Sequence, residues 1–406
     1  MVENERKDDN TGDSGGKSPK KLRVLLRTFG CQMNIRDSEA IVGMLLEGGF
    51  GVTEVEEKAD AVLFVTCSVR QHAEDKVWSE IGRIAKGKGR SSGMEGQSTS
   101  GTFPIIGLIG CMAENYKEGA FKRAPGVDLV VGTNNIGEIP QLLKELLKAK
   151  PKTQSRGQKL AVGKDKRDEF VYQPEFHQED NHSLVVISEG CDNFCSYCIV
   201  PRVRGRLRHR KPEDILKEIK RNIEKGAACV TLLGQNVNAY KYDKTDFIDL
   251  LKLVNAITGL AEFGFVTSHP KDASLKLFQA MADLEKLKKY LHLPFQSASN
   301  RILEIMRRGY SPEHYLDLAR AYRKIVPQGE LSTDVIVGFP GETEEDFLKT
   351  KELMEEVRFN NAYIFKYSPR PNTKAEKLKD DVPKEEKERR HKILLDLQRQ
   401  ISRELK

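Results

Sequence analysis

Three cysteines fall within eight residues, at Cys191, Cys195 and Cys198, in a C-x3-C-x2-C spacing. Such close spacing brings three thiol groups together, which is typical of a metal centre. A structural zinc site and an ordinary electron-transfer 4Fe–4S cluster each use four protein ligands. A 4Fe–4S cluster held by only three cysteines therefore keeps one iron free to bind another molecule. The alternatives are a zinc knuckle that takes a fourth ligand such as His182 or His209, and a chance grouping of cysteines.

Composition limits the classes of protein that the chain can belong to. Its 406 residues, 38% hydrophobic and 31% charged, predict two or three globular domains. The longest nearly apolar run is too short to span a membrane, and the N-terminus lacks the apolar core of a signal peptide. We therefore expect a cytoplasmic location, where cysteines serve as ligands rather than in disulfides. The net charge of +7 permits a nucleic-acid partner without requiring one.

Three further cysteines each follow a predicted buried strand and precede a predicted helix. The strands are predicted at 22–29, 61–66 and 104–110, and the cysteines that follow them are Cys31, Cys67 and Cys111. In a parallel sheet the carboxyl ends of the strands share one edge, where ligands bind. The pattern thus predicts a second site with three thiolates, the alternative being three unrelated buried cysteines. The seventh cysteine, Cys229, begins a strand and is expected to pack in the core.

The second half of the chain alternates strands and helices in six units. The strands are predicted at 183–188, 229–233, 262–267, 290–293, 330–337 and 361–365. This pattern predicts an α/β protein in which a doubly wound parallel-sheet domain is followed by an open (β/α)6 barrel related to the TIM barrel. The predicted segments are a disordered tail (1–20), the first α/β domain (21–150, with a flexible insertion at 86–101), a polar linker (151–180), the partial barrel (181–375) and a C-terminal helical segment (376–406).

Seven short strings carry a family resemblance. They are TFGCQMN at 28–34, TCSVR at 66–70, EGC at 189–191, LGQNVNAY at 233–240, TSHP at 267–270, LHLPFQS at 291–297 and GFPGET at 338–343. Together with the cysteine loop they resemble the methylthiotransferase family of radical S-adenosylmethionine (SAM) enzymes, over about residues 22–390. The strings QNVNAY and TSHP resemble the tRNA branch of that family.

The resemblance implies a reaction, cofactors and partners. The substrate would be isopentenyl-adenosine at position 37, in the anticodon stem-loop of tRNA, and the product its 2-methylthio derivative. One SAM would donate the methyl group and another would yield the 5′-deoxyadenosyl radical, while sulfur would come through an auxiliary cluster. Two 4Fe–4S clusters are implied, one on Cys191, Cys195 and Cys198 and an auxiliary one on Cys31, Cys67 and Cys111. A reducing electron donor and a sulfur donor are the further partners, and no membrane is involved.

Position in the motifs suggests contacts to SAM and RNA. The residues expected near SAM are Tyr197, Gln235, Asn236, Ser268, Gln296 and Asp334, with the loop at 338–341 close to the adenosine. Each of these could instead be a strand-end polar residue that satisfies backbone groups. Alternate arginines at 202, 204, 206, 208 and 210 would share one face of an extended chain, and we expect some of Arg202, Arg204, Arg206 and Arg208 to contact RNA phosphates. They could also act on the cluster or SAM, or be solvated. His269 and His292 are expected to be structural rather than metal ligands.

One feature departs from the family pattern. The family continues into a small β-barrel RNA-binding module (TRAM), whereas this sequence stops in a charged helix predicted at 384–406. The competing interpretations are a methylthiotransferase acting on a ribosomal-protein aspartate or on threonylcarbamoyl-adenosine, and a non-catalytic iron–sulfur or zinc-binding module.

Overall fold

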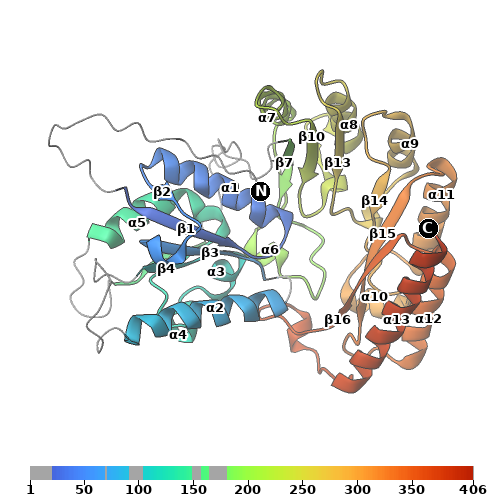
Figure 1. The fold of residues 1–406 in the computed structure, drawn as a ribbon. Coiled ribbons are helices and arrows are strands. Elements are labelled where there is room, and N and C mark those ends of the chain that lie inside the picture. Colours follow the sequence, from blue (N-terminus) through green and yellow to red (C-terminus); the bar gives the residue numbers. More distant parts are fainter. Residues whose placement is uncertain (1–20, 69–70, 91–103, 149–156, 164–180, 406) are drawn as a thin grey trace.

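A computed structural model of the chain describes residues 21–68, 71–90, 104–148, 157–163 and 181–405. The tail predicted at 1–20 and most of the predicted insertion lie outside the described residues. An α/β layer formed by the N-terminal part lies beside a curved row of strands formed by the rest of the chain (Figure 1).

The N-terminal part is built on one parallel sheet of six strands. In spatial order they are β2 (Gly51–Val52), β1 (Arg23–Thr28), β3 (Ala61–Thr66), β4 (Ile105–Gly110), β5 (Leu129–Val131) and β6 (Lys159–Ala161). Every residue of the central strands β3 and β4 is buried, as expected for parallel strands covered on both faces. The predicted strands at the centre of this sheet are confirmed.

Helices cover both faces of this sheet, which confirms the doubly wound class. Residues of α1 (Gln32–Glu47) and α5 (Ile139–Lys148) pack in one apolar cluster on one face. Residues of α2 (Gln71–Arg90), α3 (Cys111–Tyr116) and α4 (Gly119–Arg123) pack in a second cluster on the other face.

Two boundary predictions for this region were wrong. The predicted linker contains β6, which pairs with β5 and extends the sheet, because the short segment at 159–161 has a ladder partner that polarity alone does not reveal. Helix α2 continues to Arg90, so the start of the predicted insertion is helical.

The second part is an open barrel of six parallel strands in chain order. They are β7 (His182–Val186), β10 (Cys229–Leu233), β13 (Glu262–Phe265), β14 (Tyr290–His292), β15 (Glu330–Val337) and β16 (Asn361–Lys366). The hydrogen-bonded groups are β7-β10-β13 and β14-β15-β16, and a parallel bridge joins Phe263 of β13 to Leu287, in the segment before β14. All six predicted barrel strands are confirmed.

Helices connect these strands along the chain. They are α7 (Pro212–Glu224), α8 (Phe247–Asn255), α9 (Leu275–Asp283), α10 (Asn300–Met306), α11 (Pro312–Ile325) and α12 (Glu344–Val357). Several begin at a side chain that caps the first turn: the hydroxyls of Ser274, Ser299 and Ser311 accept backbone N–H groups of α9, α10 and α11. A short ribbon, β11 (Lys241–Tyr242) with β12 (Thr245–Asp246), leads into α8.

The predicted C-terminal helix is confirmed as α13 (Lys384–Glu404), which lies against α12 and β16 (Figure 1). Its Leu394 is fully buried in the barrel's apolar cluster. The helix therefore belongs to the barrel's core packing.

The two parts of the chain meet along α1 and the first barrel strands. Met33 of α1 packs against Leu184 and Val186 of β7. The buried Arg36 donates from Nε to the carbonyl of Leu184 (2.9 Å) and from Nη2 to Glu218 of α7 (2.9 Å).

In the described residues, no helix is long and apolar enough to cross a membrane.

Candidate active site

The cysteine loop follows the first barrel strand and is closed by a two-stranded ribbon. β8 (Ser188–Glu189) pairs antiparallel with β9 (Arg208–His209), so residues 190–207 form one excursion from the barrel. The excursion starts at Gly190, whose φ is 77° and whose added Cβ would lie 2.1 Å from the carbonyl oxygen of Arg206. Only glycine permits both the conformation and this approach.

The three thiols of this loop suit a metal cluster. Cys191 and Cys195 are buried, Cys198 is half-buried, and all three are free. Burial raises the pKa of Cys191 and raises that of Cys198 to about 12. A thiol in such surroundings loses its proton only when a metal or another positive charge compensates. The donor set therefore fits a thiolate-bound cluster.

The second trio lies where the topology predicted. β1, β3 and β4 are neighbours, and Cys31, Cys67 and Cys111 come directly after their carboxyl ends. A hydrogen bond from the Cys67 thiol, helped by the charge of Arg204 and opposed by burial, lowers the pKa of Cys31 to about 6. Burial raises the pKa of Cys111. Cys31 is the exposed member, while the other two are buried.

The two trios lie on elements that pack together. Cys111, at the start of α3, forms an apolar cluster with Ile199 and Val203, just beyond Cys198. In the part of the chain that the structure describes, no three His, Cys, Asp or Glu side chains converge as ligands of a single metal ion. Each cysteine of a 4Fe–4S cluster binds a different iron, so its thiolates stand further apart than the ligands of one ion. Ligation by either trio stays a prediction.

Arg308 is a site residue that the sequence analysis missed. It is buried, and its Nη1 lies 3.4 Å from the Cys195 sulfur and 3.3 Å from the Tyr197 hydroxyl. Its Nη2 donates to the carbonyl of Pro294 (2.7 Å). Two consecutive arginines after a helix usually indicate solvated side chains. Here Arg307 ends α10 in a left-handed conformation (φ 59°), and the side chain of the next residue, Arg308, is buried.

The expectation that the arginine segment is extended was wrong, whereas RNA contact by some of its arginines stays a prediction. The segment begins with a helical turn, α6 (Val200–Val203), and only Arg208 and His209 are in a strand. Arg204 is 4% exposed and pairs with Asp37 across the interface (2.6 Å), so a phosphate cannot reach it. Arg210 is also buried, in an ion pair with Glu218 (2.7 Å).

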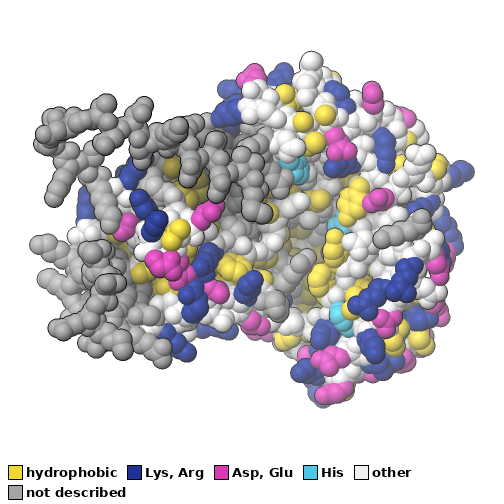
Figure 2. Space-filling model, in the orientation of Figure 1, with side chains coloured by type: hydrophobic (Ala, Val, Ile, Leu, Met, Phe, Trp, Pro, Cys, Tyr) yellow, Lys and Arg dark blue, Asp and Glu magenta, His cyan; other side chains and the backbone are white. Residues whose placement is uncertain are grey.

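The other arginines of the row differ in their exposure. Arg202 and Arg206 are exposed, and Arg206 pairs with Asp192 (3.1 Å). Arg208 is half-buried beside Glu189 (3.4 Å) and Asn134 (3.4 Å). On the face shown in Figure 2, Lys and Arg side chains are interspersed with Asp and Glu. Arg202 and Arg206 remain the stronger predictions for RNA contact.

Two of the predicted SAM residues, Asn236 and Gln296, have unpaired polar atoms at the strand ends, and so does His269, which was expected to be structural. Asn236 Oδ1, His269 Nε2 and Gln296 Oε1 are buried and have no hydrogen-bond partner among the described residues. Buried polar atoms are normally paired, so these atoms suit a polar ligand. The set fits the amino acid part of SAM, which carries both donors and acceptors.

The remaining predicted SAM residues have protein partners. Gln235 Oε1 accepts the backbone N–H of Gly190 (2.5 Å), which fastens the cysteine loop to the end of β10. Ser268 donates to the carbonyl of His292, and Asp334 lies 3.5 Å from the His292 Nε2 atom. For Gln235 the structure therefore favours the alternative of a residue that satisfies a backbone group.

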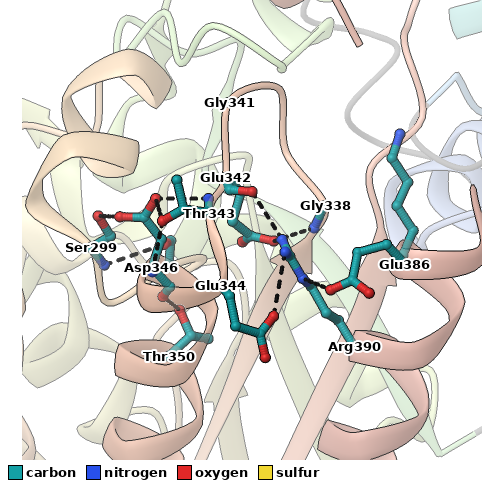
Figure 3. Close-up of polar contacts among 12 residues, drawn as sticks. Ser299, Gly338, Gly341, Glu342, Thr343, Glu344, Asp346, Thr350, Glu386 and Arg390 are labelled. Atoms are coloured by element: carbon teal, nitrogen blue, oxygen red, sulfur yellow. Dashed lines mark hydrogen bonds and ion pairs between the residues drawn. The ribbon is translucent and has the colours of Figure 1, made fainter. Parts of the chain in front are cut away.

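The predicted adenosine loop at 338–341 is held by the C-terminal helix (Figure 3). Glu342 Oε2 accepts the backbone N–H of Gly338 (2.6 Å) and Nη1 of Arg390 from α13 (2.7 Å). Arg390 also donates from Nε to Glu386 (2.7 Å). Phe339 of this loop shares an apolar cluster with Tyr197, so the loop and the cysteine motif meet.

Comparison with known proteins agrees with this architecture. The Radical SAM superfamily matches residues 185–354, and the Uncharacterized protein family UPF0004 matches residues 23–132. Two curated relatives are named tRNA-2-methylthio-N(6)-dimethylallyladenosine synthase. That of Moorella thermoacetica is 42% identical over 95% of this chain and 84% of its own length. That of Syntrophomonas wolfei is 43% identical over 96% and 85%.

Solved structures share the fold at low identity. The radical SAM methyltransferase TsrM from Kitasatospora setae has a TM-score of 0.60 at 13% identity, over 87% of this chain and 74% of its own. The cobalamin-dependent radical SAM enzyme OxsB has a TM-score of 0.57 at 14% identity, over 91% and 56%.

A partial barrel with a three-cysteine loop after its first strand defines a radical SAM enzyme, and this chain is one. Its similarity to the curated relatives then defines the branch. The chain belongs to the tRNA-2-methylthio-N(6)-dimethylallyladenosine synthase family, and its cofactors are SAM and 4Fe–4S clusters.

Proposed function

We infer that the chain is a methylthiotransferase that converts N6-isopentenyladenosine at position 37 of tRNA to its 2-methylthio derivative. Family membership supports this reaction. The observation that carries the proposal is the packing of Cys111 against Ile199, which brings the elements of the two cysteine trios together.

Two groups of cysteines would bind the two clusters of the enzyme. Cys191, Cys195 and Cys198 would hold one cluster, and Cys31, Cys67 and Cys111 would hold the auxiliary cluster. When bound, SAM and its cluster supply a primary carbon radical, which is able to remove the unactivated hydrogen at C2 of adenine. Asn236 and Gln296 would bind the amino acid part of SAM through their unpaired oxygens. Gln235 would hold the cysteine loop in place.

The partners follow from this chemistry. The anticodon stem-loop of tRNA would be the substrate, and one of two SAM molecules would supply the methyl group. A reducing electron donor and a sulfur donor complete the reaction. Because the substrate is tRNA, we propose that the protein works in the cytoplasm.

Mass analysis of tRNA nucleosides tests the reaction. Anaerobically reconstituted protein, a reductant, SAM and isopentenylated tRNA should yield the 2-methylthio nucleoside and 5′-deoxyadenosine. Matched tRNA without the isopentenyl group is the control and should remain unmodified. Equal modification of both tRNAs, or of neither, would contradict the substrate assignment.

Iron content tests the two ligand sets. The wild-type chain should hold about eight irons, and replacing either trio by alanine should leave about four. Cys229→Ala is the matched control: this half-buried cysteine begins β10, and its loss should leave the iron content unchanged. Zinc in place of iron, or a trio variant that keeps all its iron, would contradict the assignment.

A further inference from the structure

Arg204 is a buried cation at the boundary between the two parts of the molecule. It follows α6, on the excursion that carries the barrel's cysteines, and its side chain is 4% exposed. Its Nη2 donates to Asp37 (2.6 Å) and to Asn34 (3.2 Å), both on α1. The barrel segment thus places a guanidinium inside the N-terminal part, beside the helix that begins next to Cys31.

The surroundings of Arg204 connect it with the auxiliary trio. The Oδ1 atom of Asn34 accepts from Arg204 and also lies 3.8 Å from the Cys31 sulfur. Val203, the residue before Arg204, packs against Cys111. The charge of Arg204 acts to lower the pKa of both Cys31 and Cys111, although burial raises that of Cys111 overall. The carboxylate of Glu189, on the strand before the cysteine loop, also faces it at 3.5 Å.

Burying the guanidinium of Arg204 beside two carboxylates costs free energy, because charges must be removed from water even when they are paired. A function for the buried cation would explain why this cost is tolerated. Asp37 and Glu189 come from different parts of the chain, so Arg204 ties the auxiliary site to the radical site. The thiolates of an iron–sulfur cluster add negative charge at this place, and N–H groups near the sulfurs stabilise it.

We propose that Arg204 is a positioning residue for the auxiliary cluster. It is a cation that the barrel supplies beside the thiols of the N-terminal part, where Asp37 and Asn34 hold it. The auxiliary site is therefore complete only when the two parts are docked. This inference rests on the proposed function, because it takes Cys31, Cys67 and Cys111 as cluster ligands. Positive charge and N–H donors near the sulfurs stabilise the reduced, more negative form and so raise the reduction potential.

The test measures the reduction potential of the auxiliary cluster alone. The full chain with Cys191, Cys195 and Cys198 replaced by alanine is reconstituted anaerobically and titrated by electron paramagnetic resonance. In that background Arg204→Gln should shift the midpoint potential to a more negative value, whereas Arg204→Lys, which keeps the charge, should stay near the parent value. Arg36→Gln is the matched control, because Arg36 is also a buried guanidinium that joins α1 to the barrel. It should leave the potential unchanged.

The outcomes separate the two proposals. If the background protein assembles no cluster, the ligand assignment in the proposed function fails. If a cluster assembles and Arg204→Gln leaves its potential unchanged, the inference about Arg204 fails alone. An equal shift with Arg36→Gln would overturn it too, because general loosening of the interface would then explain the effect. If Arg204→Gln cannot be reconstituted, Arg204→Lys decides: a parent-like potential supports the inference, and a negative shift overturns it.

Discussion

At the scale of single residues, the candidate site contains buried cations and unpaired polar atoms, which suit charged and polar ligands. Arg308 lies beside Cys195, and Arg204 donates to Asn34, whose Oδ1 atom is 3.8 Å from the Cys31 sulfur. Each cysteine trio thus has a buried cation near it. Buried atoms without partners, such as Gln296 Oε1, cost free energy in the isolated chain. Such costs are typical of sites that a ligand completes.

The first prediction concerns His269, which should stay neutral in the folded protein at any ordinary pH. Its Nδ1 accepts the backbone N–H of Lys271 (3.2 Å), and burial, helped by the charge of Arg308, lowers its pKa from 6.5 to about 2. Below pH 6.5 the unfolded chain therefore binds a proton that the folded chain does not. The free energy of unfolding should fall by about 1.4 kcal/mol per pH unit as acid is added, from this group alone.

His269→Asn should remove that contribution and make urea unfolding less dependent on pH between about 5 and 6.5. His314→Asn, which changes an exposed histidine on α11, is the control and should leave the pH dependence as in wild type. Equal slopes for the wild type and the His269 variant would show that the histidine is protonated in the folded state.

At the scale of elements, a glycine with positive φ directly precedes three of the six cysteines that are predicted to be cluster ligands. Gly30, Gly110 and Gly190 directly precede Cys31, Cys111 and Cys191, and all three have positive φ values. The backbone therefore turns sharply between a strand end and the cysteine, in a conformation that other residues rarely adopt.

We predict that Gly30→Ala destabilises the fold by about 3 kcal/mol, because strain at φ 126° adds to a Cβ placed 2.3 Å from that of Cys67. Chemical denaturation measures the loss. Gly49→Ala is the matched control: its φ is 84° but nothing lies within 4 Å of an added Cβ, so only about 1 kcal/mol is expected. Equal losses at the two sites would mean that contact with Cys67 contributes nothing.

Helix α13 provides a prediction for a second element. Arg390→Met leaves the buried carboxylate of Glu342 without its cation, so a loss of about 3 kcal/mol in the free energy of unfolding is expected. The double variant with Glu342→Gln should recover part of that loss, because a neutral amide still accepts the N–H of Gly338. No recovery in the double variant, measured by urea unfolding, would show that Arg390 acts through its other partners.

For the whole molecule, the decisive feature is the interface between the sheet domain and the barrel. It combines the apolar contact of Met33 with β7, the ion pair of Arg36 with Glu218, and the Arg204 cluster. The same interface holds Cys111 against the segment that follows Cys198. The contacts that dock the two parts therefore also bring the elements of the two cysteine trios together.

We predict that the exposed Arg206 contacts a phosphate of the tRNA substrate. Arg206→Ala should weaken tRNA binding and reduce the slope of log affinity against log salt by about 1, the effect of one lost phosphate contact. Its guanidinium is 72% exposed next to the cysteine loop. Arg320→Ala, on the outer helix α11 and similarly exposed, is the control. An unchanged slope for the Arg206 variant, measured by titration at several salt concentrations, would exclude phosphate contact.

The fold was largely predictable because local patterns and topology rules agree. Apolar strands followed by helices required parallel sheets, and all six barrel strands lie where the pattern indicated. The exceptions are informative. The three-residue strand β6 lies in a segment that is polar enough to be predicted as a linker. Only its pairing with β5 makes it part of the sheet. The arginine segment was expected to be extended, and the helical turn α6 changes which of its side chains share a face.

The sequence by itself determined which groups are available for chemistry. These are six cysteines in two trios, together with the strands that precede them and the glycines that allow the turns. These features depend on spacing along the chain and on strand order, both of which can be read locally. Only the tertiary structure decided where the charges go. Arg204 was expected to contact RNA phosphates and Arg308 was not singled out, yet both are buried, Arg204 against Asp37 and Arg308 beside Cys195. A long side chain takes the direction that the packing around it allows. Partners such as Asp37, 167 residues away, are brought near only by folding.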